Sequence, residues 1–112
     1  MKLCTSYFAK HGKHPNAVSI GGRNWWLPNL PAIPELTPPW DLVADYKYHG
    51  LSWEDYAKQY VTQLDHLGVG RVEGLLRDGM VLLCWEGPDK HCHRHLLADW
   101  LRKLGHDVSE LG

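Results

Sequence analysis

Residues 81–105, VLLCWEGPDKHCHRHLLADWLRKLG, predict a buried strand, a polar loop and an amphipathic helix in that order. Residues 81–84 form a short apolar run, which is typical of a strand covered on both faces. The following Gly-Pro pair breaks regular structure, because Pro lacks a backbone donor. Apolar residues at helical spacing then predict a helix over residues 92–104, with Gly105 as its C-terminal stop.

Side chains that can do chemistry are concentrated between this strand and this helix. They are Cys84, Glu86, His91, Cys92, His93, Arg94 and His95. In open α/β sheets, ligands bind in the crevice beyond the carboxyl ends of the strands. The sequence therefore places a candidate site at this junction, without specifying a reaction.

The remaining patterns predict a small α/β fold. Further strands are expected at residues 3–8, 17–20 and 106–111, and helices at 41–48, at 53–67 and from 69 to a stop at Gly79. Asp41 and Ser52 are the predicted caps of the first two helices. Residues 9–16 are expected to form a loop. Residues 24–40 contain five of the seven prolines and predict an ordered wrapping loop or a lid. The expected architecture is one domain, residues 1–112, with a three-layer, Rossmann-like, mostly parallel sheet of about four strands and flanking helices.

Composition excludes several classes of protein. Hydrophobic residues make up 44% of the 112 residues, which excludes a disordered chain. The net charge of −1 gives no bulk attraction to nucleic acid or to a membrane surface. No apolar run approaches the ~20 residues that span a bilayer. Three cysteines are an odd number and suggest reduced thiols in a cytoplasmic protein. The six tryptophans fit a core of large side chains better than ligand stacking.

The pattern Cys84-Trp85-Glu86, followed by Cys92-His93-Arg94 and the helix after it, resembles the family called domain of unknown function 488. Further similarities lie along most of the chain, at residues 5–8, 19–20, Arg23, 39–40, 46–47, Tyr56 and Tyr60. The resemblance implies a small three-layer α/β fold and no settled activity. The sequence differs from longer members in lacking a helix between the first two strands.

An anion is one expected ligand of the site. A helix N-terminus offers free N–H groups and a partial positive charge, and Arg94 lies near it. Other predicted ligand-binding residues follow strand ends or carry charge and hydroxyl groups; they are Ser6, Tyr7, Arg23, Lys47, Tyr56 and Tyr60. The expected partner is a small anionic ligand, such as a nucleotide or phosphorylated metabolite. The alternative is that Arg94 forms a structural ion pair with Glu86 or Asp89.

Four residues are candidates for catalysis, namely Cys84, Glu86, Cys92 and His93. A Cys92 thiol beside Arg94 in a first helical turn would have a lowered pKa, as nucleophiles and redox thiols do. The alternative is that both cysteines are packed apolar residues. Glu86 is either a general base or ribose-hydroxyl acceptor, or the residue that holds Arg94. Tyr56 and Tyr60 are expected in the core, with hydroxyl groups that can also reach a pocket wall.

Zinc is the weaker alternative for the same cluster. Cysteine and histidine are zinc ligands, but there is no CxxC knuckle, and the two cysteines lie on either side of a strand–helix junction. We therefore expect no metal and no cofactor. Two functions remain open: a small enzyme acting on a phosphorylated metabolite, and a non-catalytic module that senses a ligand or docks a protein. A zinc-stabilised structural domain is the third possibility.

Overall fold

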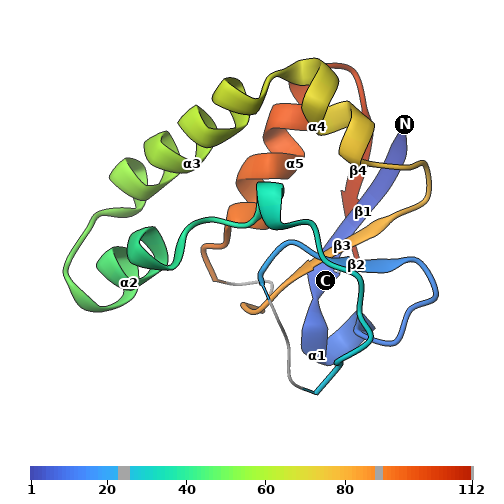
Figure 1. Ribbon diagram of the computed structural model, residues 1–112, viewed down its shortest axis with the longest axis horizontal. Helices are drawn as coiled ribbons and strands as arrows, with labels where there is room; N and C mark the ends of the chain where they lie inside the picture. The colour runs from blue at the N-terminus through green and yellow to red at the C-terminus, as the bar shows by residue number, and fades with distance from the viewer. Residues whose placement is uncertain (23–25, 88–89, 112) are drawn as a thin grey trace.

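The computed structural model describes residues 1–22, 26–87 and 90–111. These residues contain a four-stranded, fully parallel sheet with strand order β2-β3-β1-β4 (Figure 1). The strands are β1 (Lys2–Tyr7), β2 (Ala17–Ser19), β3 (Val81–Cys84) and β4 (Asp107–Glu110). Helices pack on the sheet, so the predicted three-layer, Rossmann-like α/β fold is confirmed.

Strand β3 lies inside the sheet, as the apolar run predicted, and all four of its residues are buried. Successive side chains point to opposite faces of a strand. Leu82 packs in the larger core on one face, whereas Val81 and Leu83 pack in a smaller core on the other. Cys84 follows Leu82 by two residues and therefore faces the larger core, toward the final helix.

Three helices cover the larger core: α3 (Trp53–Leu67), α4 (Val69–Leu75) and α5 (His93–Lys103) (Figure 1). The Ser52 hydroxyl accepts a hydrogen bond from the Asp55 backbone N–H at 3.1 Å, which confirms the predicted cap of α3. Helix α5 ends before Gly105, which has a φ of +93° that glycine adopts without strain. Tyr60, Leu64, Leu97 and Leu101 bury the apolar faces of α3 and α5 against the sheet.

The opposite face of the sheet carries a one-turn helix, α1 (Phe8–His11). The expected loop over residues 9–16 is therefore wrong in its first part. Phe8 leaves β1 and buries its ring beside Leu83, and the chain turns once in helical form around this anchor. Leu27 and Leu30 from the following loop complete the smaller core.

Other boundaries also differ from expectation at helix and strand ends. β1 and β4 are shifted or shortened by one residue at their ends, and α4 ends at Leu75, before the predicted stop at Gly79. Helix α2 (Trp40–Tyr48) starts directly after Pro39, so Asp41 lies in its first turn instead of capping it. A proline before a helix fixes an extended backbone without needing a side-chain cap. β2 ends one residue early, at Ser19.

The proline-rich loop is pinned to the body, as predicted for its described part, residues 26–40. It contains a short 3₁₀ helix, η1 (Pro34–Leu36), whose Leu36 side chain is fully buried. The Ile33 backbone N–H donates to the Ser19 carbonyl at 2.9 Å, and the Tyr60 hydroxyl donates to the Leu36 carbonyl at 2.7 Å. These bonds fix the loop between the edge of the sheet and α3.

Within the described residues, no helix combines the length and the apolar character needed to cross a bilayer.

Replacing Tyr60 with Phe tests how firmly the loop is held. The substitution removes a buried hydroxyl and leaves the Leu36 carbonyl without this donor, so the free energy of unfolding should fall by about 1–2 kcal/mol. Tyr48→Phe is the control, because Tyr48 is exposed and should change stability by less than about 0.5 kcal/mol. Urea denaturation of both variants measures the difference. Equal stability of the two would contradict the pinning role of Tyr60.

Candidate functional site

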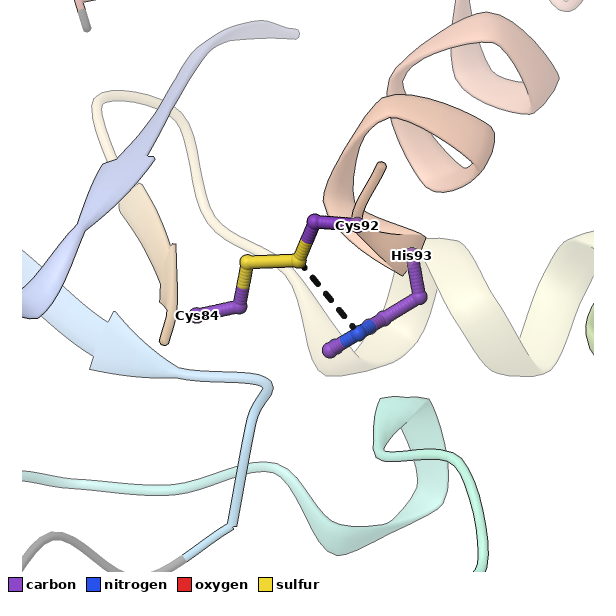
Figure 2. Close-up of side chains that lie close together, drawn as sticks. All are labelled: Cys84, Cys92 and His93. Atoms are coloured by element: carbon purple, nitrogen blue, oxygen red, sulfur yellow. Dashed lines mark hydrogen bonds between the residues drawn. A yellow bond between two sulfur atoms is a disulfide. The ribbon is translucent and has the colours of Figure 1, made fainter. Parts of the chain in front are cut away.

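The end of β3 and the start of α5 bring Cys84, Cys92 and His93 together (Figure 2). Cys84 and Cys92 form a disulfide in this structure, and Cys4 is the free cysteine. The expectation that all three thiols are reduced is therefore wrong for this pair. Cys84 closes a buried strand and Cys92 is the N-cap residue of α5. The sequence predicted both elements and one shared site for the two cysteines, and the structure places them together. The bond between their sulfur atoms was not predicted.

His93 is buried beside the disulfide and held by the backbone of another strand end. Its Nε2–H donates to the carbonyl of Ile20, and its Nδ1 lies 3.7 Å from Cys92 Sγ. Burial lowers the pKa of His93 from 6.5 to about 4. The Ile20 carbonyl and Glu86 oppose this shift, whereas Arg94 and His95 add to it. The imidazole is therefore neutral at pH 7.

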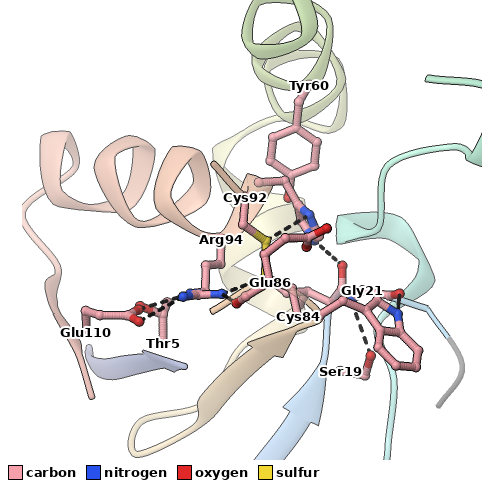
Figure 3. The surroundings of a disulfide bond; sticks show 12 residues. Thr5, Ser19, Gly21, Tyr60, Cys84, Glu86, Cys92, Arg94 and Glu110 are labelled. Atoms are coloured by element: carbon pink, nitrogen blue, oxygen red, sulfur yellow. Dashed lines mark hydrogen bonds and ion pairs between the residues drawn. A yellow bond between two sulfur atoms is a disulfide. The ribbon is translucent and has the colours of Figure 1, made fainter. Parts of the chain in front are cut away.

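Arg94 is fully buried, with 0% of its side chain exposed, and it forms an ion pair with Glu110, whose side chain is 25% exposed. Its guanidinium donates two parallel hydrogen bonds to Glu110, at 3.1 and 3.0 Å, and a third to Cys84 Sγ at 3.0 Å (Figure 3). It also donates to the Glu86 carbonyl. This is the structural ion pair considered from the sequence, but the partner is Glu110 instead of Glu86; Asp89 lies outside the described residues. Glu110 lies sixteen positions after Arg94 in the sequence, so no local spacing could predict this ion pair.

A pocket of about 510 Å³ opens beside the disulfide, and we call it the aromatic pocket. Rings from three separate parts of the chain line it, together with both glycines after β2 and the start of α5. The residues are Gly21, Gly22, Thr37, Pro38, Trp40, Val43, Tyr46, Lys47, Trp53, Tyr56, Trp85, Glu86, His91, Cys92 and His93. A Cβ on Gly21 would lie 3.1 Å from Cys84 Cα, so glycine allows the two strand ends to approach closely.

One ion pair lies in the wall of the aromatic pocket. The Lys47 ammonium from α2 is 2.8 Å from the Glu86 carboxylate that follows β3. Both side chains are partly exposed, so solvent and a ligand can reach them. Burial raises the pKa of Tyr56 well above its usual range, and the nearby Glu86 and Tyr46 raise it further. Tyr56 therefore remains a neutral hydroxyl donor at the pocket wall.

Some of the site residues predicted from the sequence line the aromatic pocket, and others lie elsewhere. Glu86, Cys92, His93, Lys47 and Tyr56 line the aromatic pocket, and Cys84 lies behind Cys92. The others do not contribute to its wall. Ser6 bonds His11 at 2.8 Å beneath the other face of the sheet, Tyr60 holds the loop, and Arg94 lies over the Tyr7 ring at 5.7 Å. Arg23 lies outside the described residues.

The tryptophans correct the sequence interpretation most directly. Of the five that the structure describes, none is fully buried, so a tryptophan-rich core is wrong. Trp40, Trp53 and Trp85 line the aromatic pocket instead, with Trp40 66% exposed and Trp85 41% exposed. Trp40, Tyr46 and Trp53 were not predicted as site residues, because their spacing follows ordinary helix patterns. The large number of tryptophans and tyrosines in so small a domain was the one sequence feature that pointed to an aromatic site.

A model of the family described as DUF488-N3a, active DUF488-N3 subclade, matches residues 13–105. The chain belongs to the DUF488 family. This confirms the resemblance carried by the Cys84 to Arg94 pattern. Neither the curated proteins nor the solved structures contain a significant match. In this DUF488 protein, the pattern thus corresponds to a disulfide, a buried ion pair and one wall of the aromatic pocket.

Replacing Arg94 with Ala should destabilise this DUF488 protein strongly. The change leaves the partly buried Glu110 carboxylate without its cation and the Glu86 carbonyl without this donor, which costs about 3–5 kcal/mol for a broken, largely buried pair. Arg71→Ala is the matched control, since its ion pair with Glu35 is exposed and should contribute less than about 1 kcal/mol. Chemical denaturation of both variants measures the two losses. A loss for Arg94→Ala no larger than the control would rule out its structural role.

The buried His93 should make the disulfide form less stable in acid. Below its ordinary pKa of 6.5 the unfolded chain gains a proton, whereas the folded chain gains one only near pH 4. The free energy of unfolding should therefore fall by about 3 kcal/mol as the pH drops through this window. His93→Gln should flatten this part of the profile in urea denaturation, and His66→Gln, at an exposed position, should not. Parallel profiles for all three proteins would contradict this assignment.

Proposed function

We propose that the aromatic pocket binds a nucleotide, or another small molecule that carries a flat ring and a phosphate, and that the protein acts on it enzymatically. The observation that carries the proposal is the composition of the pocket wall. Exposed rings surround a volume of about 510 Å³, and a lysine and a carboxylate lie within reach of the same ligand. Ligand pockets of this size with a few convergent polar groups are the usual binding sites of small molecules.

Stacking supports a flat ligand. The Trp40 and Trp85 rings are substantially exposed, although burying tryptophan is favourable. A base placed against such a ring gains about 1–3 kcal/mol from stacking. Trp53 lies parallel to His91, with ring centroids 4.5 Å apart, and this pair extends the aromatic wall.

Charge supports a phosphate and a hydroxyl group on that ligand. The Lys47 ammonium is a donor for phosphate oxygens, and the Glu86 carboxylate accepts hydrogen bonds from ribose hydroxyls. Glu86 also supplies a general base, which takes a proton from an attacking water or hydroxyl. A cytoplasmic location, where reduced thiols persist, belongs to the same proposal.

A non-catalytic binding module is the second candidate. The observation that favours it is the direct Lys47–Glu86 ion pair, which occupies the carboxylate that catalysis needs. In such a module the ligand would separate the pair, and the ligand would leave unchanged.

Binding is tested by calorimetry with a panel of nucleoside phosphates. Trp40→Ala should weaken binding roughly tenfold to a hundredfold through lost stacking. Tyr48→Ala is the matched control, because Tyr48 is exposed on the same helix but does not line the aromatic pocket. Lys47→Ala should lower the affinity for phosphate-bearing ligands by more than it lowers the affinity for the free base or the nucleoside. Absence of binding across the panel, or equal affinity of the Trp40 and Tyr48 variants, would refute the proposal.

Turnover separates the two candidates. Chromatography of each nucleoside phosphate after incubation should reveal product, and Glu86→Gln should abolish it while the ligand still binds. Binding without product in the unaltered chain would leave the non-catalytic module as the function.

A further inference from the structure

Three potential metal ligands converge behind the aromatic pocket. The Sγ atoms of Cys84 and Cys92 and a ring nitrogen of His93 all lie within 4.8 Å of one another, and the three residues are buried (Figure 2). Two thiolates and an imidazole form a ligand set that zinc accepts. The sequence argued against zinc because the cysteines lack the usual spacing. The fold removes this objection, since it places the N-cap of α5 against the end of β3.

The hydrogen bond on the far side of His93 orients the ring for a metal. Nε2–H donates to the Ile20 carbonyl, which fixes the proton on Nε2 and leaves a lone pair on Nδ1. Nδ1 is the nitrogen that faces Cys92 Sγ, at 3.7 Å. Histidines that bind metals commonly donate their other N–H to a backbone carbonyl or carboxylate in this way.

Charge around the two sulfur atoms also fits a metal-bound pair. Arg94 donates to Cys84 Sγ at 3.0 Å, and Glu110 holds the guanidinium in place (Figure 3). Hydrogen bonds of this kind stabilise a thiolate. A divalent ion neutralises two thiolates, so the buried cluster would carry no net charge of its own, and burial of uncompensated charge is avoided.

We propose that the reduced form of this protein binds one zinc ion through Cys84, Cys92 and His93. Three protein ligands leave a fourth position for water or a ligand, as in catalytic zinc sites. Cys92 and His93 also line the aromatic pocket, so this position lies on the side of the proposed substrate. The zinc site stands on the three side chains and does not depend on which ligand the aromatic pocket takes.

The disulfide and the zinc site exclude each other, because both use the same sulfur electron pairs. A dithiol reductant supplies two electrons and two protons to the Cys84–Cys92 bond and becomes a cyclic disulfide itself. Each of the two protein thiols then releases its proton to solvent as it binds the ion. The oxidised form of the protein therefore holds no zinc, and the reduced form holds one.

Metal stoichiometry tests the proposal in the 112-residue chain. The protein is reduced anaerobically with dithiothreitol, freed of it by gel filtration, equilibrated with Zn²⁺ and analysed for bound metal. We expect one zinc per chain after reduction and none in the oxidised protein. Cys92→Ser and His93→Gln should lose this zinc, whereas Cys4→Ser, the matched control at the free cysteine, should retain it.

Cobalt gives a readout on the unaltered chain, independent of whether the variants fold. Titration of the reduced protein with Co²⁺ should produce thiolate-to-cobalt charge-transfer absorption and the visible bands of tetrahedral coordination, saturating at one equivalent. Reoxidation of the disulfide should abolish both. The proposal is overturned if reduced protein shows no thiolate charge transfer. It is equally overturned if oxidised and reduced protein bind the same amount of zinc, or if Cys4→Ser loses as much as Cys92→Ser.

Discussion

The buried guanidinium of Arg94 is the constraint on which the site depends. A charge removed entirely from water must be paired and hydrogen-bonded, and four separate groups fulfil this requirement. They are the Glu110 carboxylate from β4, the Cys84 sulfur from β3, the Glu86 carbonyl after β3 and the Tyr7 ring at the end of β1. Thr5 completes the arrangement by donating to Glu110 at 2.6 Å. The first turn of α5 is thereby fixed against three neighbouring strands, and Cys92 and His93 are fixed with it.

The sequence predicted the parts that rest on local patterns. Alternation and apolar runs located β3, the cap at Ser52 located α3, and Gly105 marked the end of α5, because each signal depends on residues only a few positions apart. Cys84, Glu86, Cys92 and His93 were recognised as one cluster for the same reason. The pairing of Arg94 with Glu110 needs the parallel order of the strands, which local patterns do not specify.

The wall of the aromatic pocket escaped sequence analysis for a different reason. Trp40 and Tyr46 lie on α2 and Trp53 begins α3, where aromatic residues at helical spacing ordinarily indicate a core. They become pocket residues because α2 contributes only Leu42 as a buried side chain and otherwise extends beside α3 (Figure 1). The helix cannot bury its rings in the sheet core, so they face the opening beyond the strand ends. The interpretation of Tyr60 as core was sound, since it lies two turns deeper in α3.

The same geometry explains why one short segment serves several chemical purposes. Residues 84–87 leave the sheet at a strand end and residues 90–94 lead into a helix start, so their side chains face both the core and the opening. Arg94 and Cys84 lie on the core side, where burial fixes their positions, and Glu86 and His91 lie on the open side, within reach of solvent. Cys92 and His93 lie between the two. The bond between the two sulfur atoms therefore lies between Arg94, which donates to Cys84, and the wall of the aromatic pocket, which Cys92 lines.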